Sequence, residues 1–302
     1  MMNLKQFHYV LTLAGAGSFA KAAEALGISQ PSLSQYVKKI EQQLGVMLFD
    51  RTGGSVRLTD AGQIYIEAGR KILDVERQMQ GQFNDLAEHK SGTITIGTSP
   101  YRSASMMPAI ARRFAQKYPG MHLVVEEMTS SELMEATEHG QFDVCLTMLP
   151  IDENAFRFEK ITEEEMILAV PSQYPPFPTV MLADRKYPAI DVSVLDKQPF
   201  VMITEGQFMQ KALDNLAREQ GLSLKKSAVV KSLEAQIAMV RAGVGMALVP
   251  HGIECFCAPS EVIFYSLQQP LPKREVVVMW KAERELNRVT EDLLRMMKEI
   301  VW

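Results

Sequence analysis

The sequence lacks a run of 18 apolar residues anywhere along its 302 positions, so we expect no membrane-spanning helix. Its first residues also lack a basic segment followed by an apolar core, which predicts a cytoplasmic chain without a secretion signal. Only three cysteines occur, Cys145, Cys255 and Cys257, and their spacing fits neither a disulfide framework nor a zinc site. Idle thiols are the simpler interpretation of these cysteines, and a redox sensor is the alternative.

Sequence motifs of the common enzyme classes are missing too. The chain contains no GxSxG, HExxH, P-loop or Rossmann fingerprint. Its five histidines are scattered without the spacing of metal ligands. We therefore expect no enzyme activity, no bound metal and no cofactor.

The net charge of −4 disfavours a protein that coats nucleic acid, but the charge is unevenly distributed. Residues 1–60 carry six basic and four acidic side chains, a balance of +2, so the remaining residues sum to −6. A basic N-terminal part on an acidic body is typical of site-specific DNA binding, because such binding needs only local contacts to phosphates.

Three short apolar-periodic segments open the chain, at residues 4–15, 19–26 and 30–44. Gly27 ends the second segment, and Ser29 is in the position to cap the third. A helix, a turn that contains glycine and a second helix form the layout of a helix-turn-helix.

Residues 46–59 predict two short strands around a Gly-Gly turn, which is the pattern of a wing. Thr59 then caps a long helix from Ala61 to about Glu88. About 26 residues at 1.5 Å each give a rod of about 40 Å. Apolar residues recur along it at steps of three and four, so the helix needs a partner, and a second copy of the chain is the simplest one. The predicted dimerisation residues are Tyr65, Ala68, Ile72, Val75 and Met79.

Beyond residue 91 strands and helices alternate, which predicts an α/β region with parallel sheets and ligand sites at the carboxyl ends of the strands. The predicted strands are Thr93–Gly97, His122–Met128, Val144–Met148, Glu165–Val170, Phe200–Ile203, Ala228–Val230, Met246–Val249, Val262–Tyr265 and Val276–Trp280. The predicted helices lie near 104–117, 131–139, 207–220, 233–242 and 284–300.

The motifs of the first 62 residues resemble the LysR-type transcriptional regulators. The most specific run extends from Ser18 to Ser34, and it continues through Leu48-Phe49-Asp50-Arg51 to Leu58-Thr59-Asp60-Ala61-Gly62. Weaker similarity covers essentially the rest of the chain. It includes Met106-Met107-Pro108, Gly140-Gln141-Phe142-Asp143 and the run from Val240 to Pro250.

The resemblance implies a winged helix-turn-helix, a linker-helix coiled coil and a periplasmic-binding-protein-like effector domain of two α/β subdomains, assembled as a dimer of dimers. It also implies double-stranded DNA as a partner and a small-molecule effector between the subdomains, with a carboxylate as the candidate class and RNA polymerase as a further candidate partner. The expected boundaries are 1–60 for the DNA-binding domain, 61–90 for the linker helix and 91–302 for the effector domain, with subdomain one at 91–163 and 268–302 and subdomain two at 164–267.

DNA contacts are expected from the third helix and the wing. Glutamine can pair with adenine in the major groove, whereas lysine and arginine mostly fix the register on phosphates. A solvated polar face on a packing helix is the alternative. Members of the family usually carry arginine where this chain has Gln35, so we expect an altered operator. The candidates are Gln30, Pro31, Ser32, Ser34, Gln35, Lys38, Lys39, Arg51, Thr52 and Arg57.

Effector contacts are expected from the loops that follow three strands, where the resemblance places the cleft. Hydroxyl groups and free helix N–H groups at such loops can bind polar or anionic ligand atoms. Ordinary helix capping is the alternative for these side chains. The candidates are Thr98, Ser99, Tyr101, Arg102, Thr129, Ser130 and Thr204.

One further departure from the family is the proline-rich stretch 174–190, which is longer than usual and affects either the lip of the pocket or oligomer contacts. A solute-binding protein is the competing function, because the effector half alone would suggest one. The missing export signal and the complete winged head disfavour that alternative.

Overall fold

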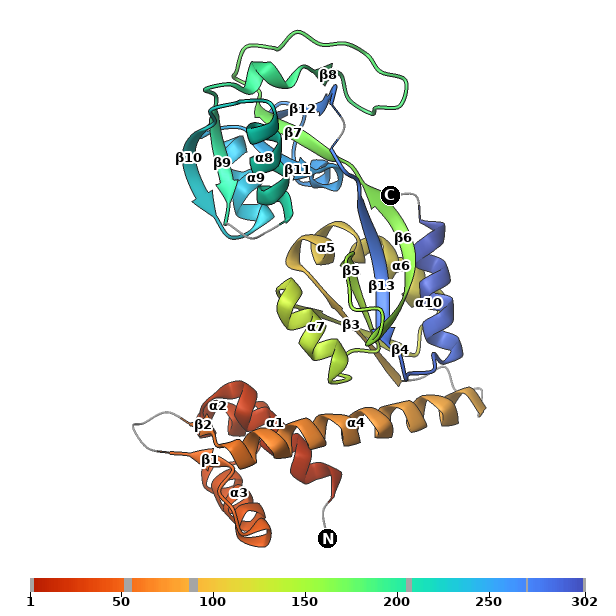
Figure 1. Ribbon diagram of the computed structural model, residues 1–302. Helices are drawn as coiled ribbons and strands as arrows, with labels where there is room; N and C mark the ends of the chain where they lie inside the picture. Colours follow the sequence, from red (N-terminus) through yellow and green to blue (C-terminus); the bar gives the residue numbers. More distant parts are fainter. Residues whose placement is uncertain (1–2, 52–55, 87–91, 205–207, 270, 301–302) are drawn as a thin grey trace.

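The structure is a computed structural model that describes residues 3–51, 56–86, 92–204, 208–269 and 271–300. Figure 1 shows three parts in chain order, namely a helical head, one long helix and a two-part α/β body. Across these described residues, no helix is both long and apolar enough to cross a membrane.

The helical head packs around a single apolar core to which Val10, Ala23 and Leu33 contribute from three helices. Gly27 has a φ of +65°, a left-handed conformation that glycine adopts without strain, and it turns the chain between the second and third helices. The Ser29 hydroxyl accepts from the Ser32 amide at 3.3 Å, so the predicted cap is confirmed. The elements are α1 Leu4–Ala16, α2 Phe19–Ala25, α3 Gln30–Leu44, β1 Phe49–Asp50 and β2 Arg57–Leu58.

The long helix α4 spans Asp60–Leu86 and begins against the head. The Thr59 hydroxyl caps it by accepting from the Gly62 amide at 3.0 Å. A Cβ atom on Gly62 would lie 2.1 Å from the carbonyl oxygen of Leu48, so only glycine fits where the helix crosses the chain just before β1.

One face of α4 carries an exposed apolar stripe, in agreement with the predicted steps of three and four residues. Tyr65 does not belong to it. Its ring is buried in the head and stacks on Phe7 at 5.0 Å, because the first turns of α4 complete the core of the head. The stripe consists of Ile64, Ala68, Ile72, Val75, Met79 and Phe83.

The half of the body nearer to α4 is a five-stranded sheet in the order β4-β3-β5-β13-β6 (Figure 1). Helices α6 and α10 cover one face of this sheet, and α7 covers the other. The elements are β3 Gly92–Thr98, α5 Pro100–Ser105, α6 Met107–Lys117, β4 Met121–Glu127, α7 Ser130–Glu138, β5 Val144–Met148, β6 Phe156–Glu164, β13 Arg274–Lys281 and α10 Arg288–Glu299.

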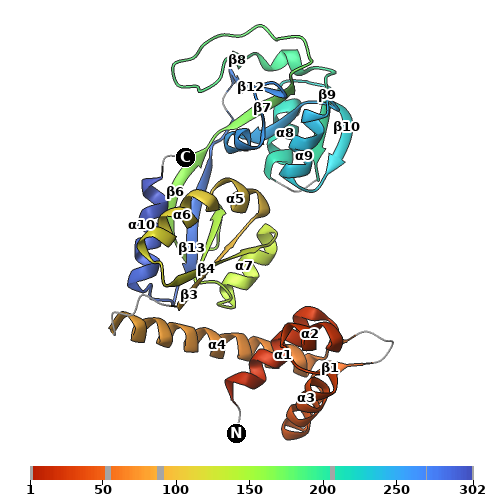
Figure 2. The same cartoon turned by 180° about the vertical axis from the view of Figure 1, so that it is seen from behind.

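The distal half contains a four-stranded sheet in the order β11-β7-β12-β8 and a parallel pair β9-β10. Helix α8 packs on one side of the core strand β7, and α9 packs on the other. Figure 2 shows both helices lying beside β9 and β10 in this half. The elements are β7 Met166–Pro171, β8 Ala189–Ile190, β9 Pro199–Ile203, α8 Phe208–Glu219, β10 Lys225–Val230, α9 Leu233–Arg241, β11 Ala247–Pro250 and β12 Val262–Leu267.

Two expectations about the body are corrected. The sheets are mixed rather than parallel, because β13 runs antiparallel to β5 and β6, and β7 runs antiparallel to β11 and β12. Strand β6 was not predicted, since its sequence FRFEKITEE is mostly polar, as suits an edge strand. Only Glu165 separates β6 from β7, where the chain passes into the distal half, and it returns between β12 and β13.

Candidate functional site

Helix α3 is amphipathic, with a buried face and an exposed polar face. Leu33, Val37 and Ile40 pack into the core of the head. This packing leaves the predicted DNA-reading side chains of Gln35 and Lys39 exposed to solvent. The structure places the remaining candidates of this helix as follows: Gln30, Pro31, Ser32 and Lys38 are exposed, and Ser34 is half-buried.

The wing arginines differ in their surroundings. Arg51 pairs with Glu41 at 2.9 Å and lies over the ring of Phe19, and the Glu41 carboxylate is 2% exposed. Arg51 therefore neutralises a buried acid, a structural task that the sequence did not reveal. Arg57 is exposed on the second strand of the wing and is available to DNA. Thr52, also predicted to contact DNA, lies outside the described residues.

Several predicted effector residues are engaged within the protein. The Thr98 hydroxyl is fully buried and donates to the carbonyl oxygen of Leu146 at 2.9 Å. Ser99 caps α5, accepting from the Arg102 amide at 3.4 Å, and at the start of α7 the Thr129 hydroxyl donates to the Glu132 carboxylate at 2.7 Å. Both side chains are therefore engaged at helix starts, as the capping alternative expects, and their role toward an effector stays a prediction.

The other two hydroxyl candidates remain accessible to a ligand. Ser130 is exposed at the first position of α7. Thr204 is exposed at the end of β9, although its hydroxyl donates to the carbonyl oxygen of Val230 at 3.0 Å. These two side chains therefore lie at strand and helix ends, as the sequence predicted.

A buried charge cluster joins the two halves of the body. Arg102 binds Glu164 at 2.9 Å, Arg274 approaches the same carboxylate oxygen at 3.6 Å, and all three side chains are at most 5% exposed. The Tyr101 hydroxyl donates to the second oxygen of Glu164 at 3.3 Å. Two guanidinium groups thus share one carboxylate, which leaves a surplus positive charge in a buried site.

Arg274 is the less well compensated of the two cations. Its guanidinium donates to thioether sulfurs, at 2.9 Å to Met148 and 3.1 Å to Met209, and it lies over the ring of Phe208. Sulfur is a weak acceptor. Burial, only partly offset by Glu164, lowers the pKa of Arg274 to about 10. In addition, Nε of Arg102 is buried without a hydrogen-bond partner.

Tyr101 carries the contact across the two halves. Although it belongs to α5 of the proximal half, its ring is buried among Ile167, Ile253 and other residues of the distal half. A Cβ atom on Gly252 would lie 2.6 Å from the Tyr101 hydroxyl oxygen, so the backbone of the distal half approaches closely here. Burial, reinforced by Glu164, raises the pKa of Tyr101.

The sequence did not identify Glu164, Arg274, Met148 or Met209 as site residues. Met148, Glu164 and Arg274 are terminal residues of three different strands, Met209 is the second residue of α8, and no local motif marks any of them. The sequence offered one signal that could have identified Glu164: it is a charged residue directly at the expected first crossing between the subdomains.

The cysteines do not form a reactive pair of low-pKa thiols. Burial raises the pKa of Cys145 to about 12, and burial also raises those of Cys255 and Cys257. Because the thiolate is the reactive species, these shifts disfavour the redox-sensor alternative. No group of three or more potential metal ligands occurs within the described part of the chain.

The fold and these two sites define a class: a DNA-binding winged head joined by one helix to a bilobed ligand-binding body. Comparison with known families agrees. Residues 4–63 match the helix-turn-helix of bacterial regulatory proteins of the lysR family, and residues 87–302 match the LysR substrate binding domain. The chain belongs to the LysR family of transcriptional regulators, and it is not an enzyme.

Similar proteins span the full length of the chain. The regulator BudR of Raoultella terrigena is 28% identical over 98% of this chain and 100% of its own length. The DNA-binding dual regulator OxyR of Escherichia coli is 26% identical over 97% of this chain and 93% of its own length.

Solved structures show the same architecture. A full-length OxyR variant of Pseudomonas aeruginosa is 25% identical, with a TM-score of 0.71 over 99% of this chain and 95% of its own. CbnR in complex with its target DNA is 20% identical, with a TM-score of 0.70 over 98% of this chain and 99% of its own. The predicted fold class is therefore confirmed.

Proposed function

We propose that this regulator responds to a small anion, a carboxylate being the leading class, that binds between the two halves of the body. The observation that carries the proposal is the surplus buried cation formed by Arg102, Arg274 and the single carboxylate of Glu164. A buried charge without a full partner is destabilising, so such a group is expected where a ligand completes the site.

A ligand carboxylate at this point would accept hydrogen bonds that now end on thioether sulfurs or, at Nε of Arg102, on nothing. Charge-assisted bonds to a carboxylate are about twice as strong as neutral ones. The accessible hydroxyls of Ser130 and Thr204, together with Ser99 and Thr129, are proposed to select the rest of the ligand. Thr98 is proposed to act on the ligand only indirectly, because its hydroxyl binds the backbone carbonyl of Leu146.

We further propose that the apolar stripe of α4 pairs with the stripe of a second copy. Val75 is 65% exposed and Met79 is 47% exposed within one chain, an unfavourable arrangement unless a partner covers them. Two such dimers would present paired heads to DNA as a dimer of dimers, with 61–90 as the linker. The protein would act in the cytoplasm, and contact with RNA polymerase remains a prediction.

On DNA, we propose that Gln35 and Gln30 read bases in the major groove while Lys38, Lys39 and Arg57 bind phosphates. Arg51 is proposed to contribute less than its charge suggests, because Glu41 already holds its guanidinium.

A paired screen tests the effector proposal. Small carboxylates and matched neutral amides would be added to the wild-type protein and to the Arg274→Met variant, and the melting temperature and operator gel shift would be measured. We expect carboxylates alone to stabilise the wild type and to change its gel shift, with no effect on the variant. Stabilisation by the amides, or equal stabilisation of the variant, would show that the buried cations do not bind the effector.

A further inference from the structure

The linker helix α4 has a second functional face, on the side away from the apolar stripe. Asp74, Arg77, Gln78 and Gly81 follow one another at the i, i+3, i+4, i+7 spacing of a single helical face. Asp74, Arg77 and Gly81 lie against the proximal half of the body, as shown by a salt bridge, a hydrogen bond and a close approach, and Gln78 donates to Asp74 on the same helix. One helix therefore faces a second chain on one side and its own effector domain on the other.

The centre of this contact is a buried ion cluster. Asp74 pairs with Arg284 at 3.2 Å, and Arg284 also binds the carboxylate of Asp143 and the carbonyl oxygen of Phe142. The side chains of Asp74, Arg284 and Asp143 are 4%, 7% and 14% exposed. Gln78 donates to the second oxygen of Asp74 at 2.9 Å, so this carboxylate is satisfied on both sides.

Two more contacts fix the helix in place. Arg77 donates to the carbonyl oxygens of Gly140 and of Gln141, the latter at 2.9 Å. Gly140 has a φ of +69°, and a Cβ atom there would lie 2.3 Å from Cγ of Asp74. Only glycine permits this approach, so the loop and the helix are fitted to each other.

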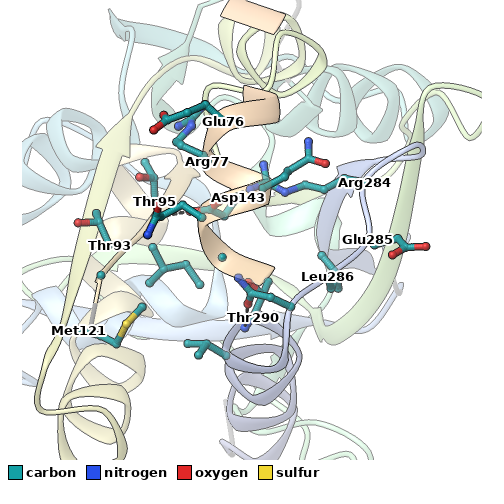
Figure 3. Close-up of a pocket in the computed structure, with 17 residues that line it drawn as sticks. Glu76, Arg77, Thr93, Thr95, Met121, Asp143, Arg284, Glu285, Leu286 and Thr290 are labelled. Carbon is teal, nitrogen blue, oxygen red and sulfur yellow. Dashed lines mark hydrogen bonds and ion pairs between the residues drawn. The ribbon is translucent and has the colours of Figure 1, made fainter. Parts of the chain in front are cut away.

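Beside the cluster lies a cavity of about 350 Å³, lined by residues of α4, of β3 and of the segment that leads into α10. Figure 3 shows Arg284 reaching toward Asp143 at this cavity, whereas the carboxylate of Glu76 points away from both. The contact is thus polar and incompletely packed. Such a contact can open at lower cost than an apolar core, because water can solvate the groups it releases.

Two strands connect this cluster to the charged site between the halves. Asp143 directly precedes β5, whose last residue is Met148, and Arg284 lies three residues beyond β13, whose first residue is Arg274. β5 and β13 are hydrogen-bonded neighbours, and Met148 pairs with Val276. The cation proposed to bind the effector and the ion cluster on α4 therefore lie at opposite ends of one rigid pair of strands.

We propose that the Asp74–Arg284–Asp143 cluster is a latch that couples the effector site to the orientation of α4 and hence of the DNA-binding heads. This inference rests on the proposed effector response. A change at Arg274 is passed along the paired strands β5 and β13 as one body, and the latch transmits it to α4 because its groups are charged, buried and held on both sides.

A double-mutant cycle tests the latch without a known effector. DNA selected from a random pool by the wild-type protein would serve as the probe. Arg274→Met is expected to change affinity for it by about threefold or more in the wild-type background and by less than about 1.5-fold when Asp74→Asn is also present. Equal changes in both backgrounds would refute the latch.

Matched variants keep this result interpretable. Glu76→Gln removes a carboxylate from the same helix, two residues away, and is expected to leave the Arg274→Met effect unchanged. Arg77→Met acts at a side chain that is 38% exposed and is expected to weaken the coupling without exposing a bare buried charge. If Asp74→Asn fails to fold, Arg77→Met takes its place, and an unweakened effect would then refute the latch.

Amide hydrogen exchange separates the latch from the proposed function. Arg274→Met is expected to speed exchange at residues 74–81 in the wild type, and not in the Asp74→Asn or Arg77→Met background. If the wild type selects no DNA, the proposed operator binding fails while this exchange result still decides the latch. Unchanged exchange at 74–81 on Arg274→Met would overturn the latch alone.

Discussion

Removing the cation Arg274 and removing the anion Glu164 from the buried charge cluster should change the stability of the protein in opposite directions. The cluster holds two cations, Arg102 and Arg274, and one anion, Glu164. Arg274→Met leaves a balanced Arg102–Glu164 pair and places a thioether beside Met148. Glu164→Gln leaves two buried guanidinium groups without a counter-charge.

The magnitude follows from the pKa of Arg274. A fall from 12.5 to about 10 means that the folded state disfavours the charged guanidinium by roughly 3 kcal/mol, at 1.36 kcal/mol per unit. Arg274→Met removes this penalty, but it also removes the favourable cation–π contact with Phe208. We therefore expect Arg274→Met to stabilise the domain by about 1–3 kcal/mol. Breaking the cluster by Glu164→Gln should cost about 3–5 kcal/mol.

Fluorescence-detected unfolding can measure both effects. Both tryptophans lie beyond residue 279, and Trp280 is buried in β13, so the signal reports the effector domain. At about 2–4 °C per kcal/mol, we expect a rise of about 2–12 °C for Arg274→Met and a fall of about 6–20 °C for Glu164→Gln. Arg241→Met removes an exposed pair with Glu261 and should shift stability by less than about 1 kcal/mol.

The essential result is that Arg274→Met and Glu164→Gln change the stability of the domain in opposite directions. If Arg274→Met destabilised the domain as much as Glu164→Gln does, its guanidinium would be fully compensated and the argument for an anionic effector would fail. If both were neutral, the cluster would be hydrated rather than buried.

Three further outcomes are expected. Val75→Glu should weaken dimers by about 4 kcal/mol, which is roughly a thousandfold in dissociation constant, while Gln80→Glu on the same helix should not. Sedimentation measures both, and an equal oligomer size for the two variants would refute pairing through the apolar stripe of α4. Gln35→Arg should change base preference at one position per half-site by about 1–3 kcal/mol in a bound-site selection. Lys39→Ala should weaken binding to all sites evenly and flatten the salt dependence of the DNA affinity. An unchanged consensus for Gln35→Arg would mean that the side chain reaches no base. Ser130→Ala should reduce the response to an active carboxylate without altering ligand-free DNA affinity, and equal loss of both would indicate a structural role.

Local signals in the sequence were sufficient for the head and the linker. Gly27 and Ser29 act within a few residues of their own positions, so their roles as turn and cap could be read directly and are confirmed. The helical period of α4 likewise showed an apolar stripe. Tyr65 was misassigned to it because period alone cannot tell a stripe that faces a second chain from one that completes the head's own core.

Strand direction and the edge strand β6 depended on tertiary structure. The alternation of strands and helices indicated an α/β body, but β13 returns to the proximal sheet from the far end of the chain and enters it antiparallel. The polar pattern of β6 becomes a strand only because β13 supplies its hydrogen-bonding partner.

The sequence by itself determined the family, the layout of the domains' elements and the exposed polar face of α3, because these depend on residues close together in the chain. Only the tertiary structure decided the chemistry of the proposed effector site and of the proposed latch. Arg102, Glu164 and Arg274 are separated by 62 and 110 positions, and Asp74 and Arg284 by 210. Their burial and mutual distance set their charge balance, and both exist only once the two crossings between the halves bring distant strand ends together.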